Sequence, residues 1–178
     1  MELKTAEEFK STEELFEYWK SFRAEVKEVL KRIPADKFTI SPPGRWSISE
    51  VAEHLYLTQY NISRTIPIVY AGKFGFETDE QKFLHYEKIR DYFFRPSGVK
   101  NPDAVAPLNK YSLEQILLLL DEAELKMEKS LKNKEKSALQ KRGFTHPYFG
   151  ILNLFNFLWV MSLHEHSHLV ALKERSES

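Results

Sequence analysis

The hydrophobic positions of this chain recur mainly at intervals of three and four residues, which is the spacing of amphipathic helices. The first such stripe follows Ser11 and ends before Pro34. Ser11 and Glu14 have the spacing of a capping box, in which two side chains satisfy free backbone amides at a helix start. The stripe consists of Leu15, Trp19, Phe22, Val26, Val29, Leu30 and Ile33. We therefore expect a long amphipathic helix in this segment.

A second helix is predicted to begin at Ser47, which forms a capping box with Glu50. Its apolar stripe continues until just before Gly72, and Pro67 should kink this helix or end it early. Between the first two helices, residues 34–46 contain three prolines and a glycine. Such a composition disfavours helix and indicates an ordered turn region.

A third helix is predicted from Ser112 and Gln115, with a stripe from Ile116 to Leu131. The charged residues that follow indicate a solvated helix end and a turn. A last helix should begin near Asn153, which is a suitable N-cap, and continue to about residue 173. No segment shows the alternating pattern of strands. The sequence thus predicts an all-α fold, a four-helix bundle with one long irregular connection, formed by residues 1–178 as a single domain.

The long connection covers residues 73–110, the least regular part of the chain. A short helix from Thr78 to about Phe93 is predicted within it. A connection of this length often carries function as a lid or as one wall of a pocket, and it can equally be a surface covering. If it forms a pocket wall, the candidate residues are Tyr86, Arg90 and Tyr92.

Charge and composition narrow the partners. The 178 residues include 26 basic and 26 acidic side chains, so the formal net charge is zero and no nucleic-acid partner is expected. The most apolar segment, residues 149–163, is too short and too polar to cross a membrane. The charged N-terminal segment lacks the pattern of a secretory signal, which predicts a cytoplasmic location.

The candidate chemistry depends on histidine, because the chain has six histidines and no cysteine. His164 and His168 lie one helical turn apart on the inward stripe of the last helix, so both can reach one cation. His54, beside the apolar stripe of the second helix, would complete three nitrogen ligands and leave one position for water or substrate. The spacing also allows a second interpretation, namely three separate core histidines that each bond to a carbonyl or a carboxylate.

The remaining polar candidates are assigned other roles. His166 lies about 200° around the helix from His164 and should be a surface or interface residue. His85 is expected to be exposed, and His146 is expected to brace a turn beside Pro147. We expect Glu165 to be solvated. Trp46 is expected to be a structural residue at the start of the second helix, with pocket lining as the alternative.

Two segments of the chain resemble the DinB-like superfamily, also described as YfiT-like metal-dependent hydrolases. One is GRWSISEVAEHLYLTQ (residues 44–59), where a histidine follows the tryptophan by eight positions. The other is HPYFGILNLFNFLWVMSLHEHSHLVAL (residues 146–172), with its HP lead-in and closing HxxxH. The resemblance implies a four-helix bundle in which three histidines bind a divalent metal, here His54, His164 and His168. It also implies dimers, and hydrolysis or thiol transfer as the reaction.

The chain departs from the family pattern near these ligands. Many members have a histidine directly before the last ligand and a glutamine soon after it, where this chain has Ser167 and residues 169–171. A glutamate that is common in the last helix corresponds to Asn156. These differences preserve the three ligands but change their surroundings, which determine the particular activity.

The leading hypothesis is a metalloprotein that binds zinc or nickel with water as a further ligand and acts on a small-molecule substrate. The metal would lower the pKa of the water or of a substrate thiol and so generate the nucleophile. Two alternatives remain. In one, a binding or stress-response module uses the metal only to staple the bundle. In the other, the protein is a metal-free homodimer in which residues 152–163 pack against a second subunit.

Overall fold

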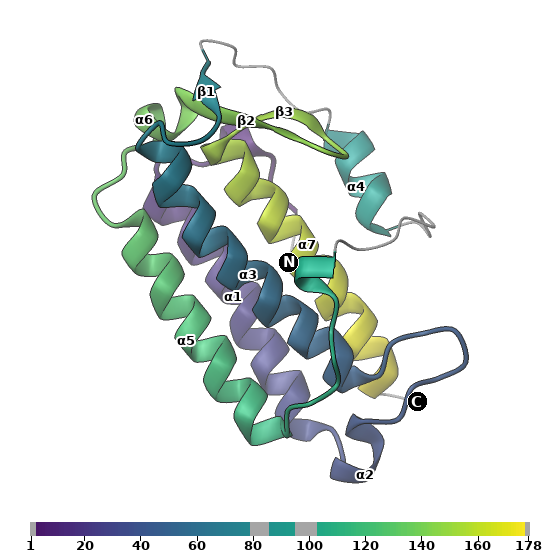
Figure 1. The fold of residues 1–178 in the computed structure, drawn as a ribbon. Coiled ribbons are helices and arrows are strands. Elements are labelled where there is room, and N and C mark those ends of the chain that lie inside the picture. The colour runs from purple at the N-terminus through teal and green to yellow at the C-terminus, as the bar shows by residue number, and fades with distance from the viewer. Residues whose placement is uncertain (1–2, 79–85, 95–102, 177–178) are drawn as a thin grey trace.

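Four long helices form the body of the molecule (Figure 1). The computed structural model describes residues 3–78, 86–94 and 103–176. The long helices are α1 (Thr12–Arg32), α3 (Ile48–Tyr70), α5 (Leu113–Leu131) and α7 (Leu154–Ser176). Around the bundle, α1 packs on α7, α7 on α3, α3 on α5, and α5 on α1. The predicted four-helix bundle is thus confirmed.

The helix starts lie where the capping signals placed them. At α3, the Ser47 hydroxyl accepts a hydrogen bond from the Glu50 N–H at 3.1 Å, and the Glu50 carboxylate accepts one from the Ser47 N–H at 2.6 Å. At α7, Asn153 acts as the predicted N-cap, because its Oδ1 accepts from the N–H of Asn156 at 2.8 Å. The helix α3 continues past Pro67 to Tyr70, so of the two effects expected of this proline the early stop does not occur, and the kink stays a prediction.

Short helices occupy the N-terminal segment and several of the connections. They are a 3-10 turn η1 (Ala6–Glu8), α2 (Ala35–Phe38), α4 (Tyr86–Phe94), a second 3-10 turn η2 (Asp103–Val105) and α6 (Lys136–Gln140). The helix α2 falls in the segment expected to be a turn region, where Pro34 serves as its N-cap residue. The helix α6 corrects the expectation of a plain helix end and turn after α5. The predicted short helix before residue 94 is confirmed over the residues of α4.

A small antiparallel sheet crosses one end of the bundle, which corrects the expectation of a chain without strands (Figure 1). Its order is β1 (Phe76–Glu77), β2 (Arg142–His146) and β3 (Gly150–Asn153). These strands are two to five residues long, too short to show a clear alternation. The sheet needs a glycine at position 143, since a Cβ there would lie 2.8 Å from the Leu152 carbonyl oxygen.

The first half of α7 is buried on every side. Residues 152–163 are all buried within this one chain, because α7 is packed against α1, α3, α4, α6 and the strands β2 and β3. The apolar surface that had favoured a subunit interface is therefore covered internally, and the homodimer stays a prediction. Among the described helices, none has the length and apolarity needed to cross a bilayer. The single domain and the cytoplasmic location also stay predictions.

A buried ion pair joins α1 to α7. The Arg23 guanidinium donates through Nε to Glu165 Oε1 at 2.6 Å and through Nη2 to Oε2 at 2.8 Å, and both side chains are almost completely inaccessible to solvent. The Arg23 guanidinium also lies 4.9 Å from the Trp19 ring. The expectation that Glu165 would be solvated is therefore wrong. The sequence of α7 alone could not reveal this, since the cation that faces Glu165 belongs to α1.

We expect Glu165→Gln to lower the free energy of unfolding by about 3 kcal/mol, because it leaves the Arg23 charge buried without its counter-charge. The matched control is Glu25→Gln, which removes an exposed ion pair with Lys173 between the same two helices. That change should cost less than about 1 kcal/mol. Urea unfolding of both variants measures the difference. Equal losses of unfolding free energy would show that the buried ion pair stabilises the fold no more than the exposed one.

Candidate metal centre

Three histidines from two helices meet inside the bundle. His54 is on α3, and His164 and His168 lie one turn apart on α7. The Nε2 atom of His164 lies 3.0 Å from His54 Nε2 and 3.2 Å from His168 Nε2. One nitrogen from each ring falls within a mutual distance of 4.8 Å. The structure thus brings together the three histidines selected from the sequence, and their use as ligands stays a prediction.

Hydrogen bonding sets the tautomer of His54. Its Nδ1 lies 2.8 Å from the carbonyl oxygen of Val105, an acceptor, so Nδ1 carries the proton. In the neutral ring, Nε2 then presents a lone pair to His164. Because the His164 Nε2 position holds either one proton or one lone pair, it can form at most one full hydrogen bond with the two neighbouring rings. In the neutral cluster, hydrogen bonding therefore does not fully satisfy both short contacts.

Burial keeps the three rings neutral. It lowers the pKa of His54 below its usual value, partly offset by the hydrogen bond to Val105. The pKa of His164 lies well below its usual value, first because of burial and then because of the charges that His168, His54 and Arg23 would place nearby. Burial, followed by His54 and Arg175, lowers the pKa of His168 to about 3. All three imidazoles therefore keep ligand lone pairs at neutral pH.

Glu53, which the sequence analysis did not select, positions the loop that orients His54. Glu53 is only 1% exposed, and its Oε2 accepts hydrogen bonds from the N–H groups of Leu108 and Asn109 at 3.1 and 2.7 Å. From the same helix, Asn61 Nδ2 donates to the Ala104 carbonyl at 3.1 Å. The segment 104–109 is thus held to α3 by Asn61 and Glu53. This segment contains Val105, whose carbonyl fixes the His54 ring.

Aromatic rings border the cluster. The ring of Trp46 lies 5.0 Å from that of His54, and Phe93 lies 5.6 Å from His164. Trp46 thus contacts the site, in agreement with the alternative considered for it, and also has a structural role. Its carbonyl accepts a hydrogen bond from Arg175 Nη1 at 2.6 Å, which ties the end of α7 to the segment before α3.

A cavity of about 210 Å³ opens onto His54 and His164. Tyr92 of α4 lines it, in agreement with the predicted pocket wall. The side chains of Tyr86 and Arg90, the other two candidates for that wall, lie outside the described part of the structure, as does His85.

The other two described histidines are separate from the cluster. His166 packs against the rings of Phe22 and Phe94, with centroids 4.8 and 5.6 Å away, so its placement apart from the cluster is confirmed. His146 braces the β2–β3 turn as expected, because its Nδ1 accepts a hydrogen bond from the Tyr148 N–H at 3.2 Å. His146 also lines the cavity, a position that its spacing in the sequence did not reveal.

The three-histidine group fits a divalent cation. Tetrahedral coordination at 2.0–2.1 Å separates ligand nitrogens by about 3.3 Å, close to the two short contacts described above. A cation would bond to all three nitrogens, whereas hydrogen bonding does not fully satisfy both contacts. Within the described ranges, no aspartate, glutamate or further histidine joins the group. This is the donor set of an open site rather than a closed structural one.

Most of the chain matches the model of a known protein family. The model of the DinB superfamily matches residues 18–171. The chain belongs to the DinB superfamily. The match includes all three clustered histidines and the Arg23–Glu165 pair. A search of curated proteins finds no sequence match.

Solved structures of similar fold extend this result. The chain superposes with a TM-score of 0.66 on YfiT from Bacillus subtilis, described as a probable metal-dependent hydrolase with an unusual four-helix bundle topology; the two are 18% identical, over 93% of this chain and 85% of YfiT. It also matches TT2238, a four-helix bundle protein, with a TM-score of 0.59 and 22% identity over 90% and 96% of the two chains. At these identities the likeness establishes the DinB fold.

A third similar structure is a mutant of the mycothiol-dependent maleylpyruvate isomerase. Its TM-score is 0.66 at 12% identity, and the match covers 95% of this chain and 63% of the isomerase. The shared bundle thus occurs in a protein described by its dependence on a thiol.

We expect the metal-free protein to lose stability as the pH falls from 7 to 5. The unfolded chain binds a proton at His168 near pH 6.5, whereas the folded chain binds it only near pH 3. Between these values the unfolded state holds more protons, so stability declines with falling pH. The melting temperature should fall by several degrees, and by less in His168→Asn. A melting temperature that is constant over this range would contradict the assigned burial.

Proposed function

We propose that His54, His164 and His168 hold a divalent cation, zinc or nickel, and that this DinB-family protein uses it to activate a nucleophile for reaction with a small-molecule substrate. One observation carries the proposal: three neutral ring nitrogens converge at the edge of a cavity large enough for a substrate group. When bound, such a cation supplies Lewis-acid chemistry and lowers the pKa of a bound water or thiol.

The protein's own residues prepare this site. The Val105 carbonyl keeps the His54 proton on Nδ1, so that Nε2 faces the other two rings. Glu53 holds the loop that carries this carbonyl. Ser167 donates to the His164 carbonyl within α7 and does not reach the ring nitrogens. The His54 ring is thus oriented by a carbonyl of the segment 104–109, which Glu53 of α3 anchors, in keeping with the usual role of groups that surround metal ligands.

Both hydrolysis and thiol transfer agree with this arrangement. YfiT is described as a probable metal-dependent hydrolase, which supports water as the nucleophile. The isomerase is described as mycothiol-dependent, which supports a thiol. Because this chain has no cysteine, a thiol nucleophile would have to arrive as a second substrate.

The cavity favours a reactive centre over a structural staple. A structural zinc site is closed by four protein ligands, whereas a catalytic one keeps a position open. The described part of the chain supplies three such ligands, and two of them, His54 and His164, line the cavity. A substrate in the cavity would therefore lie beside the cation.

We expect the protein, purified without a histidine tag and reconstituted with zinc or nickel, to retain about one metal equivalent after dialysis. Each of the variants His54→Ala, His164→Ala and His168→Ala should lower this value below about 0.2 equivalents, because two imidazoles bind far more weakly than three. Elemental analysis measures the loading.

The matched control for these variants is His166→Ala, which removes a nearby imidazole that faces Phe22 and Phe94. It should leave the metal content unchanged. A parent protein that binds less than about 0.2 equivalents of either metal would overturn the proposal, since three converging imidazoles should bind tightly.

We expect Glu53→Gln to weaken zinc binding by about 10-fold or more, because the loop that fixes the His54 ring loses a charged anchor. Competition with a chromophoric chelator measures the dissociation constant. Glu50→Gln is the matched control, since the Glu50 carboxylate caps the same helix through the Ser47 N–H and does not bind the loop. Equal affinities for Glu53→Gln and the parent would show that the loop does not position the ligand.

A further inference from the structure

The cavity beside the histidine cluster has an aromatic lining. Tyr92 and Phe93 from α4, Tyr148 and Phe149 from the β2–β3 turn, and Phe157 from α7 all line it. Several of these rings contact one another: Tyr92 lies 4.9 Å from Phe149, and Phe93 lies 5.7 Å from Phe149. Rings from three separate elements thus surround the same space.

The cavity has the size and polarity for an uncharged ring. An engineered apolar cavity of about 150 Å³ holds benzene, so about 210 Å³ accommodates a single ring with a few further atoms. Among the described residues that line it, none is an aspartate, glutamate, lysine or arginine. An ionised group placed here would lose hydration without gaining a counter-charge.

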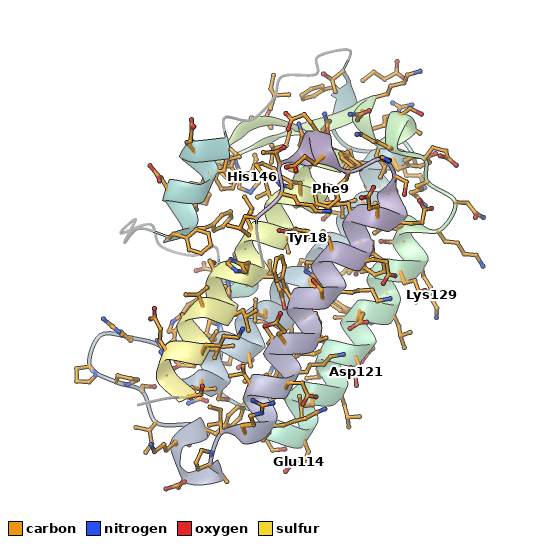
Figure 2. All side chains as sticks on the ribbon, turned by 180° about the vertical axis from the view of Figure 1, so that it is seen from behind. Phe9, Tyr18, Glu114, Asp121, Lys129 and His146 are labelled. Atoms are coloured by element: carbon orange, nitrogen blue, oxygen red, sulfur yellow. The ribbon has the colours of Figure 1, made fainter. Side chains whose placement is uncertain are left out.

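His146 is a polar group suited to orient such a ring. Its imidazole stacks on Phe149 with centroids 4.8 Å apart and an interplanar angle of 20°. The side chain lies near α4 in the view of Figure 2, and the residue lines the cavity. Since Nδ1 accepts from the Tyr148 N–H, the neutral ring carries its proton on Nε2. Burial lowers the His146 pKa, which favours this neutral form.

His146 and the histidine cluster share the cavity without direct contact. A chain of neighbouring rings connects them: His146 contacts Phe149, Phe149 contacts Phe93, and Phe93 contacts His164. The centroids of neighbouring rings in this chain lie 4.8 to 5.7 Å apart. A ligand that spans the cavity can therefore meet the cluster at one side and His146 at another.

We propose that this cavity binds the uncharged, single-ring aromatic part of the substrate, and that the Nε2–H of His146 donates a hydrogen bond to an acceptor oxygen on it. This assignment names the substrate class for the proposed function and rests on it for the reaction, but the binding of the ring depends only on the cavity and on His146.

The test compares three small probes by titration calorimetry of the full chain, both metal-free and zinc-loaded. Acetophenone has a neutral ring and an acceptor oxygen, toluene lacks the acceptor, and benzoate carries a charge. We expect acetophenone to bind more tightly than toluene by about 5-fold, the usual gain from one hydrogen bond. Benzoate should bind most weakly to the metal-free protein.

Two substitutions separate the two nitrogens of His146. His146→Asn keeps an acceptor for the Tyr148 N–H but lacks a distant donor, so it should abolish the preference for acetophenone over toluene. His146→Gln places an N–H near the position of Nε2 and should restore most of that preference. Side-chain ¹⁵N spectra of the unmodified protein provide a check without substitution, because acetophenone, and not toluene, should shift the Nε2 resonance of His146.

The outcomes are distinct. The proposal is overturned if acetophenone binds neither form of the protein, if His146→Asn keeps the full preference, or if benzoate binds the metal-free protein as well as acetophenone does. If acetophenone binds as expected while zinc does not bind, the aromatic site stands and the proposed metal-dependent function falls.

Discussion

The ion pair between Arg23 and Glu165 is the constraint on which the arrangement of α7 depends. Glu165 directly follows His164, so the helix face that meets Arg23 is set about 100° from the face that carries the histidines. Another rotation or register of α7 against α1 would separate the two charges, and a charge left buried without its partner costs several kcal/mol. Fixing Glu165 therefore also fixes the direction of the His164 ring toward α3.

The site is completed by interactions that come from the other side of the bundle. Glu53 and His54 are adjacent on α3, and both bind the segment 105–109, one through backbone amides and the other through a carbonyl. The helix α3 therefore supplies one nitrogen of the cluster, on His54, and also holds the backbone segment that orients the His54 ring. The sheet and α4 then add the aromatic wall, so the cluster opens onto an apolar space.

Much of the bundle and the three histidines could be predicted because their signals are local. Capping residues such as Ser47 act within one turn, and helical periodicity places His54, His164 and His168 on inward faces. The errors concern partners on other elements. Glu165 looked solvated because the cation that it faces belongs to another helix, and Glu53 carries no spacing signal because its partners are backbone amides. The short strands were missed because pairing, not alternation, stabilises them.

The residues of the cluster are far apart in the sequence: His54 and His164 are separated by 110 positions. The unfolded chain therefore has no preformed version of this site, and a cation that occupies it binds almost only the folded state. By thermodynamic linkage, each such binding event adds to the stability of the whole bundle in proportion to the logarithm of the free cation concentration. Under the proposed function, the supply of the cation would thus set not only how many molecules are active but also how many remain folded.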